Sequence, residues 1–157
     1  MFQVGDFVCY PMHGVGTVEA IEEQTVLGET SKYYLLRFTI NRMTAMIPVS
    51  NADSVGLRNL STYEDCMETI RFLQDDTVLQ ESDNWNQRYR DNLEKLRKGS
   101  IIDVAQVVKA LLKREKEKGL SAGERKMFLT ARQVLVAELA AATDLDNSLL
   151  MTLVGEK

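Results

Sequence analysis

The chain has 157 residues, of which 45% are hydrophobic and 27% are charged, and its formal net charge is −4 at pH 7. This composition is that of a globular protein with one ordinary domain or two small ones. We expect no membrane helix, which needs about 18 consecutive apolar residues, and no signal peptide at the N-terminus. Two cysteines and one histidine provide neither a disulfide framework nor a multi-histidine metal site. These features predict a reduced, cytoplasmic protein without a cofactor.

Residues 1–60 contain the short aromatic and aliphatic runs that are typical of β-strands. Turn residues such as glycine, proline and asparagine separate these runs. Four or five short strands at regular spacing predict a small barrel, which would bind a partner through an edge strand or a shallow face. The predicted strands are Phe7–Tyr10, Val15–Ile21, Tyr33–Phe38, Met43–Val49 and Val55–Leu57.

The pattern becomes helical after residue 60, and both prolines precede this point. The first four predicted helices each begin next to a residue that can cap the N-terminus. The capping box Ser121-Ala122-Gly123-Glu124 is the clearest of these signals, because the Ser and Glu side chains can each bond the other residue's backbone N–H. The expected helices start after Ser61 or Thr62, after one of residues 82–84, after Ser100, after Ser121 and near Leu149.

The predicted fold class is therefore α+β in two parts. A small β barrel or sheet occupies residues 1–60, and a bundle of short α-helices occupies residues 61–157. Because about 60 residues is near the lower limit for an independent core, we expect the two parts to pack together.

The net charge of −4 is unevenly distributed along the chain. Residues 64–83 contain seven acidic residues and one arginine, whereas residues 85–133 contain thirteen basic residues and six acidic ones, which is a net charge of +7. Electrostatic effects act over about 8 Å in physiological salt, so a local basic patch matters more than the total. The basic segment fits either a solvated helix surface or a nucleic-acid interface.

The sequence lacks the common catalytic and phosphate-binding motifs, including the P-loop, the dinucleotide-binding glycine pattern and paired zinc-binding cysteines. His13 follows a Tyr-Pro turn, and Cys9 lies in a predicted strand where a buried thiol would be inert. We therefore predict a binding protein and not an enzyme.

Trp85 is the only tryptophan, and it lies between the acidic and basic segments. One interpretation is that it packs into the core and anchors the start of a helix. The other is that it is exposed and stacks on an unpaired base while Arg88 and Arg90 neutralise phosphates. Tyr89 is expected to face the core together with Leu93 and Leu96.

Blocks in both halves resemble the CarD/CdnL family of bacterial transcription factors. They are VGDFVCYPMHGVGTVEAIE (4–22), NWNQRYRDNLEKL (84–96), GLSAGERKM (119–127) and residues 131–140. The resemblance spans roughly residues 2–142. It implies a Tudor-like β module that binds the RNA polymerase β subunit, and a helical module that binds promoter DNA at the upstream edge of the transcription bubble.

The resemblance also implies roles for individual residues. Trp85 would be the wedge that enters the minor groove and stabilises the open promoter complex, and the free protein would be a monomer. The basic positions that contact DNA correspond to Arg88, Arg90 and Arg125. The positions that face the polymerase correspond to Gln24, Val26, Met46 and Pro48. Some relatives carry arginines where this chain has Gln24 and Met46, which implies a more apolar contact here.

Two alternatives use the same fold. In the first, the chain is a protein–protein adaptor whose β module binds a partner and whose helices are only a scaffold. A buried Trp85 would favour that alternative. In the second, the β module belongs to a repair-coupling translocase, but 157 residues leave no room for its motor.

Overall fold

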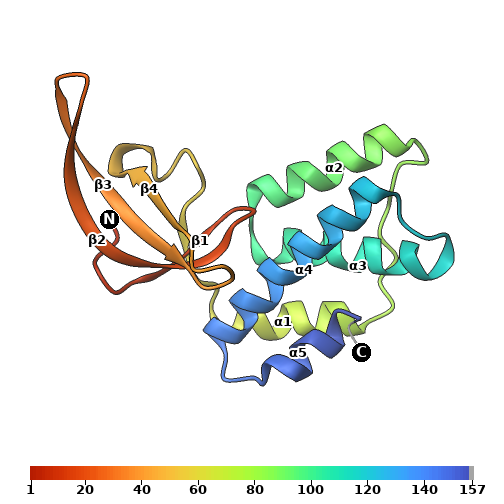
Figure 1. The fold of residues 1–157 in the computed structure, drawn as a ribbon. Helices are drawn as coiled ribbons and strands as arrows, with labels where there is room; N and C mark the ends of the chain where they lie inside the picture. The colour runs from red at the N-terminus through yellow and green to blue at the C-terminus, as the bar shows by residue number, and fades with distance from the viewer. Residues whose placement is uncertain (156–157) are drawn as a thin grey trace.

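The computed structural model describes residues 1–155, and the last two residues of the predicted helical part lie outside it. Five strands are followed by five α-helices, which confirms the α+β class in two parts (Figure 1). The strands are β1 (Phe7–Tyr10), β2 (Gly14–Val26), β3 (Glu29–Phe38), β4 (Thr44–Pro48) and β5 (Arg58–Asn59). The helices are α1 (Tyr63–Gln74), α2 (Trp85–Lys98), α3 (Ile101–Glu117), α4 (Ala122–Ala142) and α5 (Asn147–Leu153), and a 3-10 turn, η1, covers Val49–Asn51.

The strands form one antiparallel sheet in the order β4-β3-β2-β1-β5. The long hairpin of β2 and β3 extends beyond β4, which pairs only with Tyr33–Arg37 of β3 (Figure 1). A β-bulge between Val18 and Ala20 shifts the pairing of β2 with β3. The alternation of side chains between the two faces of the sheet is interrupted at that point. The expected strand at Val55–Leu57 is wrong. Gly56 has a positive φ of 81° and forms a turn, and the strand begins at Arg58.

The first four helix starts follow the caps that the sequence predicted, whereas α5 begins after Asp146, two residues before the expected start near Leu149. Thr62, Asn84, Ser100 and Ser121 each accept a backbone N–H with the side chain at the N-terminus of a helix. The capping box is complete, because the Glu124 carboxylate also accepts the Ser121 N–H. Helix α2 ends at Gly99, whose φ of 75° is the left-handed conformation that favours glycine.

Each half has its own apolar core. The sheet core surrounds Val8, Tyr34 and Leu36, and the helical core lies between α3 and α4 around Val108, Leu111 and Leu135. Helix α4 reaches the sheet and contacts β2. The two halves are therefore packed against each other, as the small size of each suggested.

Candidate nucleic-acid interface

Trp85 is the first residue of α2, directly after the N-cap Asn84. The Asn84 side chain accepts the Gln87 backbone N–H at 3.0 Å, so the first turn is fixed by a local hydrogen bond. The Trp85 side chain is 43% exposed, which is unusual for a large aromatic residue. The ring is therefore available to a partner, and this exposure does not favour the adaptor alternative.

Two sets of contacts hold the exposed indole. Its ring stacks on Tyr89, one turn further along α2, with centroids 5.3 Å apart and planes 20° apart. Its Nε1–H donates to Glu124 Oε1 at 3.2 Å and to Ser121 Oγ at 3.3 Å. Both acceptors belong to the capping box of α4. The sequence identified that box but gave no sign that it reaches Trp85.

Glu124 connects three helices. It is 3% exposed, and its Oε2 accepts Arg88 Nε from α2 at 3.3 Å. Arg114 Nε of α3 lies 3.8 Å from the same oxygen. Burial alone would raise the pKa of Glu124, but the hydrogen bonds from Arg88 and Ser121 outweigh it and lower that pKa. The carboxylate is therefore ionised at neutral pH.

Arg88 does not lie on the surface, contrary to the position expected for a phosphate contact. Its side chain is almost fully buried, where the guanidinium pairs with Glu124 and Nη1 approaches the Ser82 carbonyl at 3.4 Å. The reason is packing, because the ionised Glu124 beneath α2 requires a cationic partner. Position along α2 did not distinguish Arg88 from Arg90 as a phosphate contact, but only Arg90 is exposed.

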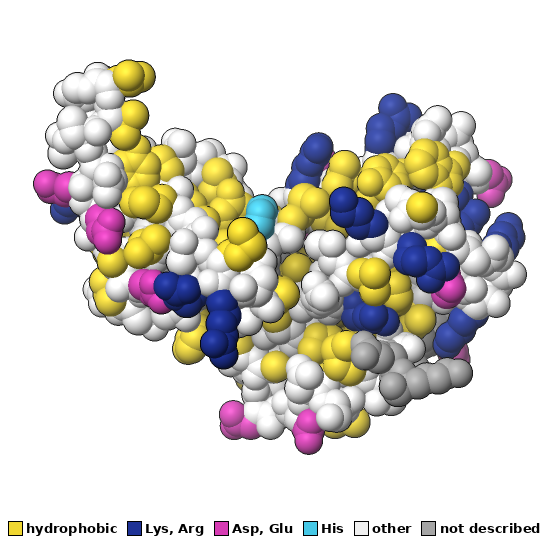
Figure 2. Space-filling view, viewed as in Figure 1, with side chains coloured by type: hydrophobic (Ala, Val, Ile, Leu, Met, Phe, Trp, Pro, Cys, Tyr) yellow, Lys and Arg dark blue, Asp and Glu magenta, His cyan; other side chains and the backbone are white. Residues whose placement is uncertain are grey.

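Arg90 and Arg125 are both exposed. Arg90 donates to Gln87 at 3.2 Å, and Arg125 lies 3.5 Å from Glu115 across the surface. Such exposed pairs are weak and can exchange for phosphates. Figure 2 shows Lys and Arg side chains spread over the helical half on the face that it draws, which agrees with the basic segment read from the sequence.

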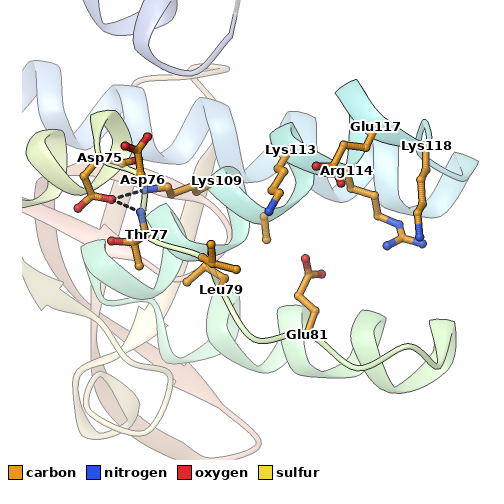
Figure 3. Close-up of a pocket in the computed structure, with 12 residues that line it drawn as sticks. Asp75, Asp76, Thr77, Leu79, Glu81, Lys109, Lys113, Arg114, Glu117 and Lys118 are labelled. Carbon is orange, nitrogen blue, oxygen red and sulfur yellow. Dashed lines mark hydrogen bonds and ion pairs between the residues drawn. The ribbon is translucent and has the colours of Figure 1, made fainter.

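A separate hollow of about 360 Å³ lies where residues 75–81 cross α3 (Figure 3). Lys109 Nζ donates to the Asp75 carboxylate at 2.6 Å and to the Phe72 carbonyl at the end of α1, and it holds the pKa of Asp75 at about 2. Lys109 therefore ties the end of α1 and the residues that follow it to α3. Equal numbers of acidic and basic side chains line the hollow, so it lacks the charge excess of an anion site. They are Asp75, Asp76, Glu81 and Glu117 with Lys109, Lys113, Arg114 and Lys118.

The four positions expected to face the polymerase share one surface of the sheet. Tyr34 and Ile47 pair across the strands and point to the core, so Met46 and Pro48, on either side of Ile47, point to the other face. Gln24 lies on that face too, because it is three residues from Ile21, which pairs with Tyr34. Val26 follows Gln24 on the same face, next to Leu27, which is fully exposed at the hairpin tip. A hollow of about 400 Å³ lies here, lined by Val26, Leu27, Glu29, Ser31 and Tyr33. We call this surface the outer sheet face.

Both cysteines are buried, and burial is the main factor that raises the pKa of Cys9 to about 12 and of Cys66 to about 11. Their thiols are therefore neutral and unreactive, as expected for Cys9. Within residues 1–155, no group of acidic, histidine and cysteine side chains has the arrangement of a metal site. No described helix is long and apolar enough to cross a membrane.

Comparisons with known proteins place both halves in one family. Residues 2–61 match the family described as "CarD-like/TRCF RID domain", and residues 68–154 match "CarD, C-terminal domain". The chain is 40% identical over 142 residues to "Putative transcription factor YdeB" of Bacillus subtilis, a match that covers 88% of this chain and 90% of that protein.

A solved structure, "CdnLNt from Myxoccoccus xanthus", is 44% identical over 38% of this chain and 83% of its own, with a TM-score of 0.33. The matches to both halves and to a relative of nearly the same extent establish the family. This chain belongs to the CarD family of transcription factors.

Proposed function

We propose that this protein binds the RNA polymerase β subunit with its sheet and promoter DNA with its helices, and that it stabilises the open promoter complex. Trp85 is the wedge that enters the minor groove at the upstream fork of the bubble. The observation that carries this proposal is the exposed indole, held by Tyr89 of α2 and Glu124 of α4, the two helices that also carry the exposed Arg90 and Arg125. The protein would act in the cytoplasm, where promoters are transcribed.

The energetics of such a wedge are sufficient for regulation. Unstacking a base step costs a few kcal/mol, and an inserted aromatic ring returns about 1–3 kcal/mol of stacking per base. A factor that binds only the open fork shifts the equilibrium by its differential affinity. A stabilisation of about 1.4 kcal/mol changes the ratio of open to closed complexes about tenfold.

Arg90 and Arg125 supply the accompanying phosphate contacts. Contacts to phosphates position a protein without reading sequence, so the wedge would act on many promoters. Arg88 has a different role from the one that the family resemblance implied. Its buried guanidinium neutralises Glu124 and so supports the wedge from below.

The outer sheet face provides the polymerase contact. The four residues expected to make this contact are apolar or neutral (Val26, Met46, Pro48 and Gln24), which fits a contact that buries apolar surface. The free edge of β4 also allows strand pairing with the partner. Binding to polymerase would raise the local concentration of a weak DNA binder, so the negative total charge is no obstacle.

The test replaces Trp85 with alanine and measures the lifetime of open complexes on promoter DNA with bacterial polymerase. We expect the Trp85→Ala protein to bind polymerase as tightly as the wild type and to shorten the lifetime about tenfold. Tyr63→Ala is the matched control, because it removes an exposed aromatic ring from the first residue of α1. Equal lifetimes for Trp85→Ala and the wild type would contradict the wedge.

A further inference from the structure

We propose that Glu124 is a positioning residue for Trp85: its carboxylate binds the indole N–H and fixes the ring in the orientation that meets DNA. This inference rests on the proposed function for its consequence at the promoter, but the bond itself can be measured in the free protein. The observations that carry it are the 3.2 Å contact between Trp85 Nε1 and Glu124 Oε1 and the burial of Glu124.

The indole is constrained in two different directions. The stacked Tyr89 ring limits rotation of the indole face, and the bond to Glu124 limits the direction of the pyrrole edge. An exposed tryptophan without such contacts would sample several rotamers and would lose that freedom on binding. Holding the ring before it meets DNA removes this cost from the binding step.

Glu124 is itself held rigidly, which makes it an effective anchor. Its Oε1 accepts Ser121 Oγ at 3.1 Å, and its Oε2 accepts Arg88 Nε at 3.3 Å. The charged groups that face it are Arg88 from α2 and Arg114 from α3. An ionised acceptor forms a stronger hydrogen bond with the indole N–H than a neutral acceptor does.

The hydrogen bond between Trp85 and Glu124 also predicts which contacts the indole can make with DNA. The indole N–H is the only polar group of the side chain, and it is already bonded inside the protein. The ring therefore meets the fork as an apolar surface, which stacks on any base and donates no hydrogen bond to a base edge. Discrimination between bases at the wedge would come from ease of unstacking and groove shape.

The first experiment measures the bond in the wild-type protein. Trp85 is the only tryptophan, so its Nε1–H gives a single resonance in a nitrogen–proton correlation spectrum. We expect slow exchange with water at neutral pH, and a shift of the resonance on acidification through a pKa below the ordinary glutamate value. A resonance that exchanges as fast as free indole and does not move with pH would overturn the proposed Trp85–Glu124 hydrogen bond. This measurement needs no variant.

The second experiment uses Glu124→Gln, which preserves the size of the side chain and removes its charge. We expect open-complex lifetimes about two- to tenfold shorter than the wild type, with polymerase affinity unchanged. The matched control is Glu94→Gln, which makes the same change at an exposed position of α2. In Glu124→Gln the pH-dependent shift of the indole resonance should also disappear.

The two proposals can fail separately. If Trp85→Ala shortens the lifetime but Glu124→Gln does not, the positioning role is overturned and the wedge stands. If Trp85→Ala also leaves the lifetime unchanged, the proposed function fails, and the positioning role at the promoter fails with it. The indole resonance still decides in that case whether the Trp85–Glu124 bond exists in the free protein.

Discussion

Arg58 and Glu138 form a two-pronged ion pair across the junction of the two halves. Arg58 Nη1 donates to Glu138 Oε2 and Nη2 donates to Oε1, each at 2.7 Å. The same guanidinium donates to the Gly99 carbonyl at 2.7 and 3.1 Å, and Ser61 donates to Glu138. Pro11 packs against Gly99 so closely that a Cβ atom at position 99 would lie 2.8 Å from the proline ring. The pair thus links β5 to α4 and to the end of α2, whose other end carries Trp85.

Replacing Arg58 with methionine is expected to destabilise the fold by about 3 kcal/mol, because it leaves the buried Glu138 carboxylate without its cationic partner. Urea unfolding followed by circular dichroism measures this loss. The matched control is Arg37→Met, which removes the exposed pair with Glu19 and should change stability little. Equal effects of the two variants would show that the junction pair is no more important than a surface pair.

The stability of the protein should fall in acid through Glu138. Burial alone would raise the pKa of this carboxyl, but Arg58 and Ser61 outweigh burial and lower it. Since the folded pKa lies below the unfolded value, the stabilisation is present above the unfolded pKa, about 4.3, and is lost as the pH falls through the folded pKa.

Urea midpoints of the wild type and Glu138→Gln, measured from pH 7 to pH 3, test this assignment. The variant should be less stable at pH 7, and its midpoint should fall less steeply with acid. Parallel curves for the two proteins would assign the acid sensitivity to other carboxyls.

A charge on the outer sheet face should weaken polymerase binding. Met46→Glu places a carboxylate at a half-exposed apolar position of β4, where it must be desolvated on contact. We expect at least a tenfold loss of affinity for the isolated RNA polymerase β subunit, measured by titration calorimetry. Leu149→Glu makes a similar change at an exposed apolar position of α5, outside the outer sheet face, and should bind normally. A Met46→Glu protein with wild-type affinity would move the contact elsewhere.

Much of the fold could be read from local signals. The caps at Thr62, Asn84, Ser100 and Ser121 act within one helical turn, so the sequence placed these helix starts correctly. The turn at Gly56 was harder to identify. The apolar residues around it suggested a strand, but the backbone there follows the packing of Gly56 against Pro11, a contact that no local pattern reveals.

The sequence by itself determined the class of fold, the helix caps, the uneven charge and the family, because these depend on neighbouring residues or on motif order. Only the tertiary structure decided which arginine is buried and what holds the tryptophan. Arg88 and Trp85 both reach Glu124, which is 36 and 39 residues away, and Arg58 reaches Glu138 across 80 residues. Spacing on α2 treats Arg88 and Arg90 alike. The packing of α4 against α2 buries Arg88 beside the ionised Glu124 carboxylate and leaves Arg90 exposed to water.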